Sequence, residues 1–106
     1  MKQIRVLGLP NCSWCESLVE NLNDAEIPYT FVDVNKNGAL ADKLEDFLQT
    51  DLYPIVLIED GTMVYYLSRP NDAERLGRNI LPNGDMAVGY YSIEALMTEI
   101  DYILKK

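Results

Sequence analysis

The hydrophobic and polar positions of the chain follow first the period of a strand and then the period of a helix. Residues 2–7 alternate between apolar and polar, which predicts a short strand. Apolar residues recur at helical spacing over residues 13–23, which predicts a helix capped by Asn11 or Cys12. Residues 29–34 are rich in β-branched and aromatic side chains and predict a second strand. A strand, a helix and a strand in this order form a right-handed unit with a parallel pair of strands.

The second half of the chain continues the pattern. Residues 39–49 predict another amphipathic helix, residues 55–59 and 62–67 predict two strands, and residues 92–104 predict a final helix. The dipeptide Asp60-Gly61 favours a tight hairpin between the two strands, which should therefore be antiparallel. The expected core face of the middle helix is Leu40, Leu44, Phe47 and Leu48.

These elements predict an α/β fold in the order β-α-β-α-β-β-α, with a four-stranded mixed sheet flanked by three main helices. Residues 68–91 contain two prolines and three glycines and show little periodicity. We expect an irregular insertion there, with a short helix over residues 72–76. A chain of 106 residues offers material for one domain, so residues 1–106 are predicted to form a single unit.

The net charge of the chain limits the kinds of molecule that it can bind. The formal net charge is -8, which opposes binding to nucleic acid and to anionic lipid. The first residues are too few and too charged for a signal peptide, and no apolar run approaches the length that spans a membrane. We therefore expect a cytoplasmic monomer that binds neither nucleic acid nor membranes.

The chain has two cysteines and no histidine. The cysteines are three positions apart, so a disulfide between them would close almost no loop and stabilise little. A closed structural zinc site needs about four ligands, which two thiols without an imidazole do not provide within one chain. We therefore predict no metal site, and the remaining readings of the pair are redox chemistry or two incidental small core residues.

The sequence Cys12-Ser13-Trp14-Cys15 follows a predicted strand and begins a predicted helix, which is the context of a redox motif. Free amide groups and the positive end of the helix dipole favour a thiolate at Cys12. The carboxylate of Glu16 opposes this effect, so we expect only a moderate activation. Cys15 lies one turn later and should be the more buried thiol, placed to resolve a mixed disulfide on Cys12.

On these residues the chain resembles the glutaredoxin family of the thioredoxin fold, and the likeness covers the element order over most of its length. The resemblance implies a cis-proline before the third strand, and Tyr53-Pro54 occupies this position. It also implies that the Tyr53 backbone pairs with an extended thiol such as glutathione, in the manner of strand addition. Trp14, inside the motif, is expected to face the substrate from an exposed position.

Two positions depart from the family pattern. The lysine that commonly precedes the first cysteine by three positions is Leu9 here. The segment Val88-Gly89-Tyr90-Tyr91-Ser92 stands where the family has Gly-Gly-x-Asp-Asp, so Tyr91 and Ser92 replace an Asp pair, and Ser92 would bind substrate through its hydroxyl and amide. The candidates for the missing positive charge are Arg69, Arg75 and Arg78, although acidic neighbours also make them typical of a solvated loop.

The expected function is reduction of protein or small-molecule disulfides, in which Cys12 attacks and Cys15 expels the reduced product. The resemblance implies glutathione as co-substrate, disulfide-containing proteins as partners and no tightly bound cofactor. A thioredoxin-like reductant recharged by a flavoprotein reductase would use the same cysteines. Two alternatives of another class are an iron–sulfur carrier or sensor, which Ser13 keeps open by resemblance, and an interaction module without redox activity.

Overall fold

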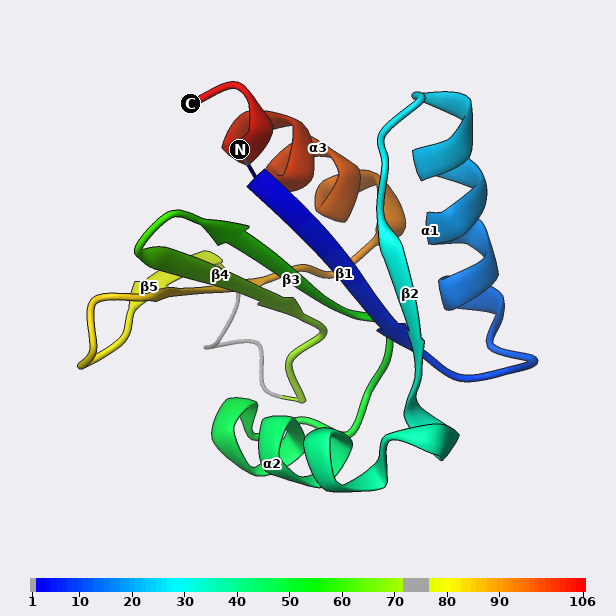
Figure 1. The fold of residues 1–106 in the computed structure, drawn as a ribbon, viewed down its shortest axis with the longest axis horizontal. Coiled ribbons are helices and arrows are strands. Elements are labelled where there is room, and N and C mark those ends of the chain that lie inside the picture. Colours follow the sequence, from blue (N-terminus) through cyan, green and yellow to red (C-terminus); the bar gives the residue numbers. More distant parts are fainter. Residues whose placement is uncertain (1, 72–76) are drawn as a thin grey trace.

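The computed structural model describes residues 2–71 and 77–106. These residues form three α-helices, a single turn of 3-10 helix and one sheet of six strands (Figure 1). In chain order the elements are β1 (Lys2–Gly8), α1 (Ser13–Asp24), β2 (Thr30–Asp33), η1 (Val34–Lys36), α2 (Gly38–Leu48), β3 (Ile55–Asp60), β4 (Met63–Ser68), β5 (Gly77–Ile80), β6 (Met86–Gly89) and α3 (Ile93–Leu104).

The strand order in the sheet is β2-β1-β3-β4-β6-β5. Strands β1 and β2 are parallel, as the strand-helix-strand pattern predicts, and β3 and β4 form the antiparallel hairpin predicted from Asp60-Gly61. Strand β1 lies antiparallel to β3. The α/β class, the three helices and the mixed sheet are confirmed, but the prediction of four strands is wrong because the sheet has six.

The two additional strands come from the segment that we expected to be irregular. Strand β6 pairs in parallel with β4 and antiparallel with β5. In the turn between β5 and β6, the backbone N–H of Leu81 donates a hydrogen bond to the carbonyl oxygen of Asp85, and the N–H of Gly84 donates one to the carbonyl oxygen of Leu81. Gly84 has a positive φ of 92°. Asn83-Gly84 is a strong hairpin signal that the sequence analysis did not use. The short helix expected over residues 72–76 lies outside the described residues.

Helices cover both faces of the sheet. Figure 1 shows α1 and α3 near one another on one side and α2 on the other. A large cluster of buried side chains joins α1 and α3 to the sheet, and a smaller one joins α2 to it. Leu18 and Leu96 are fully buried in the first cluster, whereas Leu7 and Leu44 belong to the second. Among the described helices, none is both long and apolar enough to cross a bilayer.

The face of α2 that meets the core is the predicted one only in part. Ala41, Leu44 and Leu48 are buried, and their spacing of three and four residues follows the helical period. Leu40 and Phe47, which we expected in the core, are 39% and 46% exposed. Phe47 instead packs edge-on against the ring of Tyr66 on β4. The buried face of α2 is therefore turned toward Ala41 and away from Leu40 and Phe47.

Candidate active site

The turn between β1 and α1 presents the first cysteine. Strand β1 ends at Gly8, and the chain then reverses through Asn11, whose φ of 61° is a left-handed conformation that asparagine tolerates better than most residues. Cys12 has extended backbone angles and is the N-cap of α1. A cysteine at this position has its side chain next to backbone N–H groups that have no partner within the helix.

The two thiols have different surroundings. Cys12 is partly exposed, and its Sγ accepts a hydrogen bond from the backbone N of Cys15 at 3.2 Å. Cys15 is only 2% exposed and packs in the cluster beneath α2. The motif therefore holds one accessible sulfur at the helix tip and one covered sulfur a turn behind it.

The environment of Cys15 keeps its proton on the sulfur. Burial, a hydrogen bond with the side chain of Cys12 and the charge of Cys12 together raise the pKa of Cys15 to about 12, although Leu9 and Arg69 act in the opposite direction. Burial is the largest of these causes because it penalises the charged form of the thiol. At neutral pH Cys15 is consequently a thiol in the reduced protein.

The close approach of Cys15 to the sheet depends on Gly8. A Cβ atom at position 8 would lie 3.0 Å from the Cys15 Sγ and 3.0 Å from Cε1 of Phe31. Ordinary van der Waals contacts of carbon with carbon or sulfur are longer than this. The last residue of β1 is therefore a glycine at the point where the Cys15 Sγ comes close to the strand.

The loop before β3 lies beside the cysteines. The Tyr53-Pro54 bond is cis, as the resemblance implied. The Tyr53 side chain is buried in the same cluster as Cys15, and its hydroxyl donates a hydrogen bond of 2.6 Å to Glu45. Within residues 2–71 and 77–106, no hydrogen bond engages the backbone N–H or C=O of Tyr53. Burial and the neighbouring Glu45 raise the pKa of Tyr53.

Tyr90 is a residue of this site that the sequence analysis did not identify as functional. Its side chain is 1% exposed, and its hydroxyl donates a hydrogen bond of 2.5 Å to the carbonyl oxygen of Pro54. Its ring centroid lies 6.4 Å from that of Trp14. Burial raises the pKa of Tyr90, and the charges of Cys15 and Cys12 raise it further, while Arg69 lowers it. The recognition of β6 in the sequence would have placed Tyr90 directly after a strand.

Trp14 is more enclosed than we expected. It is partly buried and packs against the large core cluster, with Tyr90 on one side and Arg69 over its ring. The Cζ atom of Arg69 is 4.0 Å from the ring centroid, within the range of a cation–π contact. The indole thus connects the cysteine motif to the segment after β4.

Ser92 and Tyr91 have different positions. Ser92 is the N-cap of α3, where its hydroxyl oxygen accepts a hydrogen bond of 3.0 Å from the backbone N of Ala95. It lines a pocket of 310 Å³ that Trp14 also lines. Tyr91 is 73% exposed and points away from the core. The structure therefore brings Ser92 next to the motif and leaves Tyr91 at the surface.

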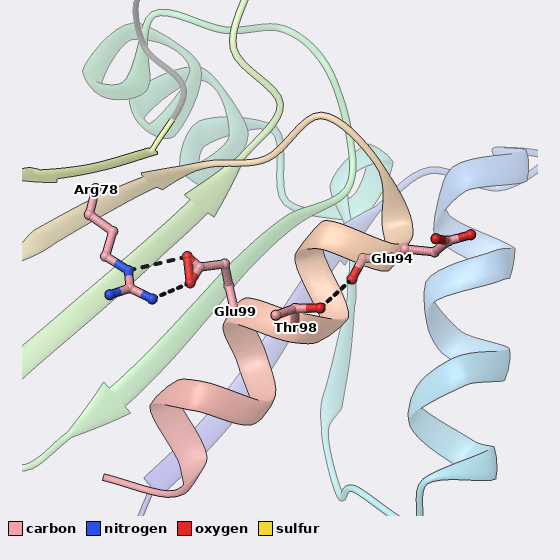
Figure 2. A network of polar contacts seen from close by, with 4 residues as sticks. All are labelled: Arg78, Glu94, Thr98 and Glu99. Atoms are coloured by element: carbon pink, nitrogen blue, oxygen red, sulfur yellow. Dashed lines mark hydrogen bonds and ion pairs between the residues drawn. The ribbon is translucent and has the colours of Figure 1, made fainter.

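Arg78 is engaged elsewhere. Figure 2 shows its guanidinium on two oxygens of Glu99 from α3, with distances of 3.2 and 2.6 Å. It also lies over the ring of Tyr102, with Cζ 4.1 Å from the centroid. Arg75 lies outside the described residues. Of the two candidate arginines that the structure describes, Arg69 is placed at the cysteine motif and Arg78 is not.

In the described part of the chain, no three histidine, cysteine, aspartate or glutamate side chains come together in a way that could hold a metal ion.

Comparison with known families adds one finding. The family model described as Glutaredoxin matches residues 1–64, which include both cysteines and the Tyr53-Pro54 pair. Comparisons with curated proteins and with solved structures found no match. The matched region ends near the start of β4, so β5, β6 and α3 lie beyond it.

Proposed function

The chain belongs to the glutaredoxin family, and from this premise we propose that it is a dithiol oxidoreductase in which Cys12 attacks disulfides and Cys15 resolves them. The family supports a thiol–disulfide oxidoreductase-like function in general. The observation that carries the specific proposal is the unequal pair of thiols at the tip of α1. Cys12 is accessible and receives an amide hydrogen bond, whereas Cys15 is covered and protonated.

The proposed first step is attack by the Cys12 thiolate on a disulfide. A bond forms between the Cys12 Sγ and one substrate sulfur, the substrate S–S bond breaks, and the second substrate sulfur leaves as a thiolate that takes up a proton. The backbone N–H of Cys15, which donates a hydrogen bond of 3.2 Å to the Cys12 Sγ, and the positive end of the helix dipole both favour a sulfur anion at Cys12.

In the proposed second step Cys15 attacks the Cys12 Sγ and releases the remaining substrate sulfur as a thiol. The mixed disulfide removes the negative charge of Cys12, and this charge is one of the causes that hold the pKa of Cys15 high. Formation of the mixed disulfide therefore makes Cys15 easier to deprotonate, and its proton goes to the departing sulfur. Over the two steps the substrate disulfide gains two electrons and the dithiol of the protein loses two.

Glutathione is the proposed electron donor, and two molecules of it would return the Cys12–Cys15 disulfide to the dithiol. The backbone N–H and C=O of Tyr53 form no hydrogen bond within the described residues, and the Tyr53 side chain packs in the same cluster as Cys15, which supports pairing with an extended tripeptide. The pocket between Trp14 and Ser92 is a second place for contact with substrate.

The proposal is tested by following the reduction of a small disulfide with glutathione and glutathione reductase, beside the same reaction with thioredoxin reductase. We expect turnover in the glutathione assay, complete loss in Cys12→Ser and retained glutathione-dependent turnover in Cys15→Ser, because a second glutathione can replace the resolving thiol. Turnover that occurs only with thioredoxin reductase would show that glutathione is not the electron donor. Equal activity of Cys12→Ser and the unaltered protein would refute the proposed chemistry.

A further inference from the structure

The guanidinium of Arg69 occupies a defined place at the cysteine motif. Arg69 directly follows β4, and its backbone carbonyl accepts a hydrogen bond of 2.6 Å from the buried hydroxyl of Thr50. Its side chain lies with Cζ 4.0 Å from the centroid of the Trp14 ring. The arginine is thus held at both ends, by Thr50 at its backbone and by the indole at its charged group.

The charge of Arg69 acts on two groups of the site. It lowers the pKa of Cys15 and the pKa of Tyr90, against the effects of burial on both groups. The protein as a whole has a net charge of -8, so Arg69 places a positive group at the site of an otherwise acidic protein.

The hydrogen-bonding edge of the Arg69 guanidinium is free in the described residues. With its Cζ 4.0 Å from the Trp14 centroid, the guanidinium is close enough to stack on the indole. A stacked guanidinium keeps its N–H donors in its own plane, where a carboxylate can bind with two oxygens. Arg5 is paired with Glu59 and Arg78 with Glu99, but Arg69 forms no ion pair or side-chain hydrogen bond within residues 2–71 and 77–106.

We propose that Arg69 binds a carboxylate of the small thiol or disulfide that reacts at Cys12, and so makes the site specific for anionic thiol compounds such as glutathione. This proposal rests on the proposed function. Leu9 stands where the resemblance implies a lysine, so the cation would come from the segment after β4 instead of the loop before the motif. A guanidinium held on Trp14 loses little freedom when it binds, because it is already in place.

The test compares three disulfides in their reaction with the reduced protein under single-turnover conditions. They are oxidised glutathione, its derivative with both glycine carboxylates esterified, and uncharged bis(2-hydroxyethyl) disulfide. In each reaction the Cys12–Cys15 pair is oxidised by two electrons and one disulfide becomes two thiols, so the redox change is the same for all three. Oxidised glutathione and its ester differ in the glycine carboxylates, and the hydroxyethyl compound has no carboxylate at all. Rate constants are measured for the unaltered protein, Arg69→Gln, Arg69→Lys and the control Arg78→Gln.

We expect Arg69→Gln to slow the reaction with oxidised glutathione by about tenfold, the size of one charge-assisted hydrogen bond at a partly buried site. The rate with the hydroxyethyl compound should change less than about twofold, since it has no carboxylate. Arg69→Lys should recover part of the loss, and Arg78→Gln should behave as the unaltered protein because its partner is Glu99. The loss should also shrink as salt is added.

The ester identifies which carboxylate is bound. A loss in Arg69→Gln that is confined to oxidised glutathione assigns the glycine carboxylate, whereas an equal loss with the ester assigns the glutamyl carboxylate. An equal loss with all three disulfides would overturn the proposal, because Arg69 would then act on thiol reactivity alone. Unchanged rates with oxidised glutathione would overturn it as well. Failure of the unaltered protein to reduce any of the three would instead refute the proposed function.

Discussion

The hydrogen bond from Tyr90 to Pro54 provides the sharpest test of how the site is held together. Tyr90→Phe removes the hydroxyl and keeps the ring, which is 1% exposed. The Pro54 carbonyl, which is also buried, is then left without this donor. An unsatisfied buried polar group costs about 1–3 kcal/mol, so we expect this loss in the free energy of unfolding.

The adjacent tyrosine supplies a matched control. Tyr91 is 73% exposed, and its hydroxyl forms no hydrogen bond in the described part of the chain. Tyr91→Phe should therefore change the unfolding free energy by less than about 0.5 kcal/mol. The assay is urea unfolding of both variants beside the unaltered protein, together with thermal unfolding, where about 1 kcal/mol corresponds to roughly 4 °C at this size.

The stability that the Tyr90 hydroxyl provides should depend on pH, in a direction that follows from its pKa. Burial raises the pKa of Tyr90 in the folded protein above the value of about 10 in the unfolded chain. The folded state therefore favours the neutral hydroxyl, and the stability from Tyr90 is complete below about pH 10 and is lost as the pH rises further. The difference between the unaltered protein and Tyr90→Phe should shrink in this alkaline range.

Tyr90→Phe also tests whether the hydrogen bond from Tyr90 to Pro54 matters for substrate binding. Since Tyr90 fixes the loop that carries Tyr53 and Pro54, Tyr90→Phe should raise the KM for oxidised glutathione more than it lowers kcat. The reasoning would be refuted if Tyr90→Phe and Tyr91→Phe unfolded at the same urea concentration. A loss of stability without any change in KM would refute the link to substrate alone.

Two further predictions follow from the surroundings of the second cysteine. Gly8→Ala places a Cβ 3.0 Å from the Cys15 Sγ, so we expect the free energy of unfolding to fall by about 1–3 kcal/mol from overpacking, as measured by urea unfolding. We also expect mixed disulfides to be released more slowly, as measured by rapid quenching. Unchanged release would show that Cys15 is not displaced. In Cys12→Ser, burial still raises the pKa of Cys15, so we expect no thiolate absorbance near 240 nm below about pH 10. A thiolate that appears near pH 8 would contradict the buried position of Cys15.

The sequence by itself determined the order of the elements that carry the site. The alternation over β1, the helical period over α1 and the Asp60-Gly61 hairpin each depend on neighbouring residues, and all three are found in the structure. The placement of Ser92 as the cap of α3 follows from the same local rules. For α1 these rules left Asn11 and Cys12 open, and the structure has Cys12 as the N-cap. The cis geometry before Pro54 came from the family resemblance.

The tertiary structure decided the features that depend on contacts distant in sequence. Strands β5 and β6 are short and weakly patterned, and β6 gains its place by pairing with β4 about twenty residues away. The exposed position of Phe47 depends on which side of α2 meets the sheet, which the helical period leaves open. Arg69 reaches Trp14 and Tyr90 reaches Pro54 only after the sheet has assembled, because no local pattern encodes contacts between residues so far apart along the chain.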